Sequence, residues 1–122
     1  MYQLRIQRIY APPTPQDGYR VLIDRLWPRG IGKTEALLNE WAKSVAPSTA
    51  LRQEFHHDHV PAAVFRTQYI AELDSNPDAA KLAVLLKEKL KDDNVTLLYA
   101  AKDEQFNHAL VLQEWLANKL GR

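Results

Sequence analysis

Two short apolar runs constrain the fold of this chain most. Residues 19–24 (YRVLID) and 95–101 (VTLLYAA) are mainly apolar and lack a clean alternation of polar and apolar side chains. That pattern is typical of strands covered on both faces, as in parallel sheets. Residues 3–9 alternate more regularly and predict a third strand. We expect a small sheet with helices packed on it.

Five helices are predicted from capping residues followed by apolar side chains at helical spacing. The five predicted start signals are Thr34, Ser48, Pro61, Asn76 and Asp103. The first helix is expected to carry Leu37, Leu38, Trp41 and Val45 on one face, and the second Leu51 and Phe55.

The predicted order is strand, strand, four helices, strand, helix. It favours a single small α/β domain over residues 1–122, with a three-stranded, mostly parallel sheet covered by about five helices. Residues 10–18 are a short connection for a parallel crossover, which usually takes about a dozen residues. The first two strands therefore either pair antiparallel or are both neighbours of the third.

Composition narrows the protein class without indicating a function. The 122 residues are 46% hydrophobic and include no cysteine. This excludes disulfides, thiolate metal sites and a cysteine nucleophile. No apolar run is long enough for a membrane span, and MYQLRIQRIY lacks a signal-peptide core. These features predict a cytoplasmic protein without membrane partners. These features do not indicate an oligomeric state.

Positive charge is concentrated near the N-terminus. The first 33 residues carry six basic and two acidic side chains, whereas the other 89 carry ten basic and thirteen acidic ones. This asymmetry indicates an anionic ligand or a nucleic acid. The alternative is that these arginines pair with acids elsewhere in the chain.

The first candidate site follows the second predicted strand. Ligand crevices of open α/β sheets lie outside the carboxyl ends of the strands, and Asp24, Arg25, Trp27 and Arg29 occupy such a position. Arginine forks suit phosphate and carboxylate, while Asp24 suits an acid/base or arginine-orienting role and Trp27 an apolar wall. The alternative is a buried Asp–Arg brace with Trp27 in the core.

The second candidate site follows the third predicted strand and includes Lys102, Asp103, Asn107 and His108. A helix N-terminus attracts anions and favours a neutral His108 that acts as a base or hydrogen-bond donor. The alternatives are that Asp103 is only a cap and that His108 only packs. We expect residues 19–24 and 95–101 to be adjacent and parallel, which puts Asp24 and His108 at one edge.

A third candidate is the run His56-His57-Asp58-His59. Such a cluster is typical of Zn²⁺, Ni²⁺ or Mn²⁺ ligands, but loop histidines without supporting hydrogen bonds bind metals weakly. We therefore predict no physiological metal, and include His57 and Asp58 as ligand-binding residues of the crevice. The alternative is a solvated helix end.

Four strings carry a family resemblance: DGYRVLIDRLWPRG (17–30), APST (46–49), HD (57–58) and TLLYAAKDEQFNHA (96–109). They resemble the YeaO-like proteins of the family called domain of unknown function 488. The resemblance covers almost the whole chain and implies a small α/β domain, with no defined activity, substrate or cofactor. Other branches often carry cysteine in the segment matching residues 99–108. Relatives commonly have glycine and proline where His56 and His59 flank the His-Asp pair.

These observations lead to two functional hypotheses. The first is an anion-binding domain, with hydrolysis or group transfer on a small phosphorylated or carboxylated molecule as the candidate chemistry. Arg25 and Arg29 would hold the anion, Asp24 or His108 would transfer protons, and Asn107 would orient the substrate. The alternative is a non-catalytic module that binds nucleic acid or protein through the basic N-terminal third. Common nucleotide-binding, serine-hydrolase and zinc-protease motifs are absent, and we expect no tight nucleic-acid binding.

Overall fold

Four parallel strands form one sheet in the computed structural model, which describes residues 2–57 and 60–122 and leaves out the side chains of His56 and His57. Their order is β1 (Leu4–Arg8), β4 (Val95–Tyr99), β2 (Tyr19–Leu22) and β3 (Glu40–Trp41). The α/β class and parallel sheet confirm the prediction, with four strands where three were expected. Both β1 and β2 pair in parallel with β4. They are therefore neighbours of β4 and not of each other.

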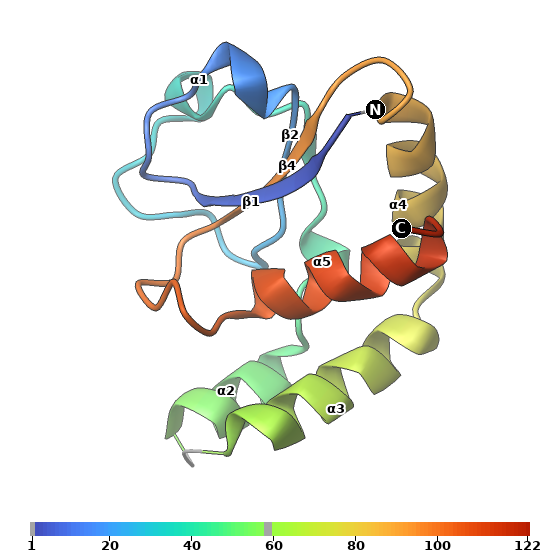
Figure 1. Cartoon of the computed structure of the whole chain (residues 1–122). Coiled ribbons are helices and arrows are strands. Elements are labelled where there is room, and N and C mark those ends of the chain that lie inside the picture. Colours follow the sequence, from blue (N-terminus) through green and yellow to red (C-terminus); the bar gives the residue numbers. More distant parts are fainter. Residues whose placement is uncertain (1, 58–59) are drawn as a thin grey trace.

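The described residues also form five α-helices (Figure 1). They are α1 (Lys33–Ala36), α2 (Thr49–His57), α3 (Ala62–Asp74), α4 (Pro77–Lys89) and α5 (His108–Lys119). Two 3₁₀ turns, η1 (Pro15–Asp17) and η2 (Lys43–Val45), also lie within the described part of the chain. Among the described residues, none of these helices combines the length and the hydropathy that crossing a bilayer requires.

Three predicted helix starts agree closely with the structure. The Ser48 hydroxyl accepts a hydrogen bond from Leu51 N–H at 3.1 Å, and Asn76 Oδ1 accepts one from Asp78 N–H at 2.9 Å. Helix α3 begins one residue after Pro61. The last helix does not begin at Asp103, because Asn107 caps α5 and Asp103 caps a separate turn before it.

The central strands are covered on both faces, as their sequence predicts. Val95, Leu97 and Tyr99 of β4 contribute to the large core with α3, α4 and α5, whereas Leu98 points to a second, smaller cluster. Likewise, Val21 joins the large core and Leu22 the smaller one. The smaller cluster also contains Ile9, Ala36 and Ala100, and Trp27, Ile31, Leu38 and Trp41 from the segment that follows β2.

The prediction of a helix over residues 34–45 was wrong. Helix α1 covers four residues, is capped by Gly32 and not by Thr34, and ends where Leu37 takes a left-handed conformation (φ 51°). The Arg20 guanidinium donates two hydrogen bonds to Ala36 O, at 2.9 and 3.2 Å. Asn39 then bonds to both backbone polar groups of Arg20. A buried arginine thereby draws this segment into the sheet as β3, and competing tertiary bonds outweigh its helical spacing.

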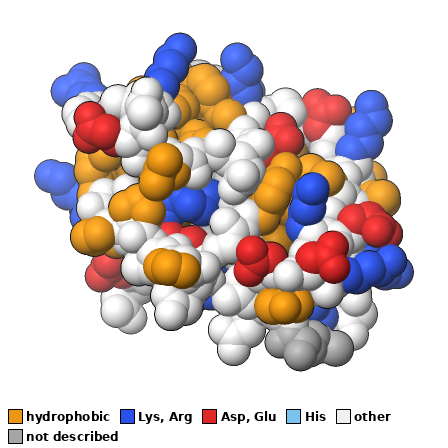
Figure 2. Space-filling model, turned by 90° about the horizontal axis from the view of Figure 1, so that it is seen from above, with side chains coloured by type: hydrophobic (Ala, Val, Ile, Leu, Met, Phe, Trp, Pro, Cys, Tyr) orange, Lys and Arg blue, Asp and Glu red, His pale blue; other side chains and the backbone are white. Residues whose placement is uncertain are grey.

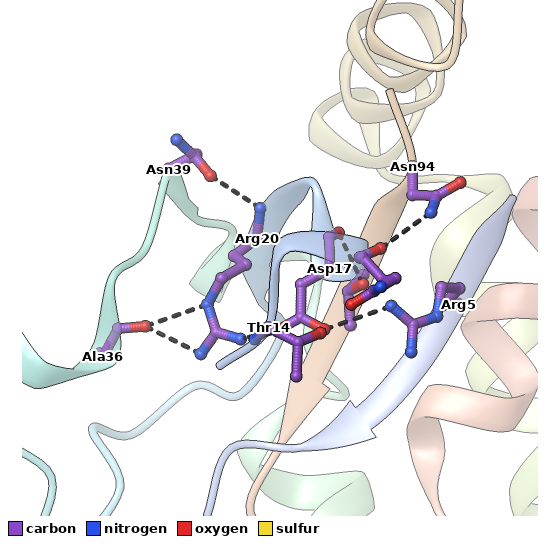
Figure 3. Close-up of polar contacts among 9 residues, drawn as sticks. Arg5, Thr14, Asp17, Arg20, Ala36, Asn39 and Asn94 are labelled. Carbon is purple, nitrogen blue, oxygen red and sulfur yellow. Dashed lines mark hydrogen bonds and ion pairs between the residues drawn. The ribbon is translucent and has the colours of Figure 1, made fainter. Parts of the chain in front are cut away.

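Arg20 is held by Asp17, whose side chain is fully buried beside it (Figure 3). Asp17 Oδ2 lies 2.5 Å from Arg20 Nη1, and Oδ1 lies 3.2 Å from Arg5 Nη1. The Thr14 amide and hydroxyl each donate to this carboxylate at 3.1 Å. Burial by itself would raise the pKa of Asp17, but the bonds from Thr14 and Arg20 together hold it below its usual value.

Gly18 allows β2 to start directly after this cluster. Its φ is 63°, and a Cβ at this position would lie 2.0 Å from Asn94 O. The Tyr19 amide donates to that same carbonyl at 2.8 Å. The close approach of the backbones therefore requires glycine here.

We predict that Asp17→Asn lowers the free energy of unfolding by about 3–5 kcal/mol at pH 7, because it leaves the Arg20 charge buried without its counterion. The lowered pKa of Asp17 means that this contribution is complete above the unfolded-state value near 3.8 and is lost as pH falls through the folded-state pKa. Urea unfolding of both proteins from pH 7 to pH 3 should show the difference narrowing below about pH 4.

Glu88→Gln is the matched control, because it breaks an exposed ion pair with Lys91. We expect it to change stability by less than about 1 kcal/mol. A similar small effect of Asp17→Asn at pH 7 would contradict the prediction.

Candidate functional site

A cleft of about 760 Å³ lies at the carboxyl edge of the sheet. Segments that follow three strands line it: Tyr10 after β1, residues 24–29 after β2, and residues 100–103 after β4. Helix α2 adds Arg52 and Phe55, α3 adds Phe65, and the region around the start of α5 adds Phe106, Asn107 and His108. The strand-end argument therefore located the part of the cleft lining that follows the strands, and not the part that α2 and α3 contribute.

Asp24 and His108 lie side by side in this cleft, as the predicted strand pairing requires. Asp24 Oδ1 is 2.9 Å from His108 Nε2, and each side chain is 15% exposed. Asp24 Oδ2 accepts a hydrogen bond from Ala100 N–H at 3.0 Å, so β2 and β4 are also joined at this edge. His108 Nε2 lies 3.1 Å from Ile23 O as well. Because both neighbours of Nε2 are acceptors, this nitrogen carries a proton.

One oxygen of the Asp24 carboxylate has no hydrogen-bond donor among the described residues. The geometry at Nε2 suits the bond to Ile23 O, and Oδ1 of Asp24 is buried with no well-aligned donor among the described residues. The 2.9 Å separation of Asp24 Oδ1 from His108 Nε2 is therefore a close contact without hydrogen-bond alignment. The contact between Asp24 and His108 is electrostatic and not a full hydrogen bond, because hydrogen bonds weaken steeply when misaligned.

Arg25 both lines the cleft and braces it. Its Nε donates to Pro47 O at 3.2 Å and its Nη2 to Ala46 O at 3.1 Å. The guanidinium therefore holds the loop before α2 against the end of β2. Arg25 therefore acts partly as the brace that the sequence allowed as an alternative to ligand binding. Its partners are backbone carbonyls, however, and not Asp24.

Trp27 also serves both roles considered from the sequence. It lines the cleft and packs on the second core cluster, where its ring centroid lies 5.2 Å from that of Trp41. Its indole N–H donates to Ile31 O at 2.7 Å. Trp41 in turn donates to Asp24 O at 2.7 Å. Trp27 and Trp41 thus hold the loop after β2 against the second core cluster.

Arg29, Arg52 and Lys102 bring positive charge to the cleft. All three line the cleft, and none forms an ion pair with a residue that the structure describes. The Arg29 backbone carbonyl accepts a hydrogen bond from the Tyr10 hydroxyl at 2.9 Å. The Nε of Arg52 is buried without a hydrogen-bond partner in the described part of the chain.

Sequence reasoning missed Arg52 as a cleft residue. The available signal was its spacing, since Arg52 precedes Phe55 by three residues and so shares a helix face with it. The prediction of this helix rests only on its apolar residues, Leu51 and Phe55.

Asn107 was expected to orient a substrate, but both ends of its side chain bind the protein. Its Oδ1 accepts from Leu110 N–H at 3.2 Å, and its Nδ2 donates to Asp103 O at 2.9 Å. Asp103 Oδ1 accepts from Gln105 N–H and Phe106 N–H. These bonds shape the turn from β4 into α5 and place His108 as the first helical residue.

The third candidate run is described only in part. His57 is the last residue of α2, and its side chain is not described. Asp58 and His59 lie outside the described residues. Among the residues that are described, no group of three His, Cys, Asp or Glu side chains is arranged to hold a metal. The expectation that this run holds no metal stays a prediction.

Comparison with known proteins places the chain in a family of uncharacterised proteins. The uncharacterized protein YeaO of Escherichia coli K12 is 49% identical over 113 residues, covering 93% of this chain and 96% of that protein. The uncharacterized protein Rv3073c of Mycobacterium tuberculosis H37Rv is 36% identical over 114 residues, covering 93% of each. No solved structure matches.

The family match is equally extensive and confirms the resemblance stated from the sequence motifs. The family described as "Inactive DUF488-N3 subclade" matches residues 3–122. The chain belongs to this subclade of the domain-of-unknown-function 488 proteins.

Proposed function

We propose that this protein binds a small phosphorylated or carboxylated molecule in the cleft at the carboxyl edge of the sheet. The observation that carries the proposal is the charge of the lining. Four basic side chains, Arg25, Arg29, Arg52 and Lys102, line the cleft together with two acidic ones, Asp24 and Asp103.

Both acidic side chains of the lining accept backbone hydrogen bonds, whereas three of the four basic ones have no ion-pair partner among the described residues. Asp103 accepts two backbone hydrogen bonds, and Asp24 accepts one and lies beside His108. By contrast, Arg29, Arg52 and Lys102 have no ion-pair partner in the described chain. A bound anion would supply the missing counterion, and guanidinium groups match phosphate and carboxylate oxygens in pairs.

Binding without turnover fits the family best. The subclade is described as inactive, and Arg25 and Asn107 are already engaged in holding the loops of the cleft. The cytoplasmic location expected from the sequence stays a prediction.

We predict that millimolar inorganic phosphate raises the melting temperature of the protein above that in chloride of equal ionic strength. Arg29→Gln and Arg52→Gln should each weaken phosphate binding by about tenfold or more, because a hydrogen bond to a charged group contributes about 1.5–3 kcal/mol. Thermal shift and calorimetric titration are the measurements.

Lys81→Gln on α4 is the control, since Lys81 is exposed and does not line the cleft. It should respond to phosphate as the unmodified protein does. Equal responses in the unmodified protein and both arginine variants would remove the proposed site, because only the general effect of phosphate on protein stability would be left.

A hydrolase is the second candidate, favoured by the contact between Asp24 and His108. An imidazole oriented by a carboxylate is a common acid/base arrangement. If it acts on phosphate esters, purified protein should release phosphate from an aryl phosphate, and His108→Gln should abolish the release. Our binding proposal predicts no release above that of a His108→Gln sample. Release that depends on His108 would establish the hydrolase in its place.

A nucleic-acid module is less well supported, because basic groups of the N-terminal third have internal partners. Arg5 and Arg20 both contact Asp17, and Arg8 donates to Ala100 O and Ala101 O. Figure 2 shows one face of the molecule, on which acidic, basic and hydrophobic side chains are interspersed.

We therefore predict no sub-micromolar affinity for mixed-sequence duplex or single-stranded probes at physiological salt. Fluorescence anisotropy over a salt series measures this affinity, since phosphate contacts give a steep salt dependence. Tight binding that is lost on reversing the charges of Arg25 and Arg29 would instead favour the nucleic-acid module.

A further inference from the structure

The cleft has an aromatic wall beside its basic side chains. Phe55 from α2, Phe65 from α3 and Phe106 from the turn before α5 all line it. The ring centroids of Phe55 and Phe65 are 4.5 Å apart, and the centroid of Phe106 lies 5.5 Å from that of Phe55 and 5.9 Å from that of Phe65. Three segments far apart in the sequence thus contribute one aromatic surface.

The side of this aromatic surface that faces away from the cleft packs on the protein core. Phe65 is only 3% exposed and packs on the buried ring of Tyr69 at a centroid distance of 5.9 Å. The Tyr69 hydroxyl donates to Val45 O at 2.8 Å, and its ring also lies edge-on to His108. Helices α2 and α3, which carry Phe55 and Phe65, lie side by side (Figure 1). The aromatic wall is therefore built into the core on one side, while Phe55 and Phe106 are only partly buried.

Two of the basic side chains that line the cleft lie close in sequence to residues of the aromatic wall. Arg52 and Phe55 are three residues apart on α2, so their Cβ atoms lie on one helix face about 5–6 Å apart. Lys102 precedes Phe106 by four residues in the segment between β4 and α5, and both line the cleft. Positive charge and aromatic surface therefore meet within one cavity.

We propose that the occupant of this cleft is an organic phosphate or carboxylate that carries a planar aromatic ring. The anionic group would lie at Arg29, Arg52 and Lys102, and the ring against Phe55 and Phe106. The volume of about 760 Å³ matches cavities that enclose whole organic ligands and far exceeds what an inorganic ion fills. This inference rests on the proposed anion binding and specifies the class of ligand.

The test uses two pairs of probes that share an anionic group and differ in the ring: methyl phosphate against phenyl phosphate, and acetate against benzoate. Isothermal titration calorimetry gives the affinities. We expect the aromatic member of at least one pair to bind about tenfold or more tightly than its small counterpart, because ring packing adds to the area buried.

Two substitutions separate the ring from the charge. Phe106→Leu and Phe55→Leu should each reduce the preference for the aromatic probe while leaving the affinity for its small counterpart unchanged. Arg52→Gln should weaken both members of the pair. Tyr2→Leu is the control, because Tyr2 is an exposed aromatic residue outside the cleft. Melting temperatures of all variants show whether each is folded.

The outcomes distinguish this inference from the proposed function. Equal affinities for both members of each pair would overturn the aromatic ligand class and leave anion binding intact. Binding of no probe would overturn both. A preference for the ring that survives both phenylalanine substitutions would overturn its placement against this wall.

Discussion

The carboxylate of Asp17 is fully buried, and the arrangement of the N-terminal half depends on it. It binds Arg5 of β1 and Arg20 of β2, while its backbone carbonyl accepts a hydrogen bond from Thr96 of β4 at 2.8 Å. Three neighbouring strands therefore meet at one residue. Because Asp17 fixes the Arg20 guanidinium, Arg20 can bind Ala36 O and draw the next segment into the sheet. The buried charge of Asp17 is thus connected through Arg20 to the segment that forms β3.

Much of the fold could be predicted because its signals are local. The apolar runs around β2 and β4 indicate two-sided burial, and Ser48 and Asn76 cap the helices that they precede. Residues 33–45 could not be predicted in the same way. Their spacing is helical, but Arg20 supplies the bonds that end α1, and Arg20 lies thirteen residues before Lys33. Local propensity is a weak guide where a buried side chain competes for backbone groups.

The candidate site could likewise be predicted only in part. The rule that ligands bind at the carboxyl ends of parallel strands brought Asp24 and His108 together from the sequence, 84 positions apart. The partners of individual side chains were not accessible in this way. Arg25 binds two carbonyls of a loop, Asn107 caps α5, and Arg52 enters the cleft from a helix that was interpreted through its apolar residues. Such roles depend on tertiary distances that spacing along one element does not encode.

The position of β4 in the sheet has a consequence for biosynthesis. Strands β1 and β2 lie on either side of β4 and pair through it, yet residues 95–99 leave the ribosome after both. During translation β1 and β2 therefore lack the strand that lies between them in the finished sheet. The residues that they pair with in β4 are about 75 to 90 positions further along the sequence. Topologies of such high contact order fold slowly. The nascent chain must therefore keep two unpaired strand edges from aggregating until its last strand emerges.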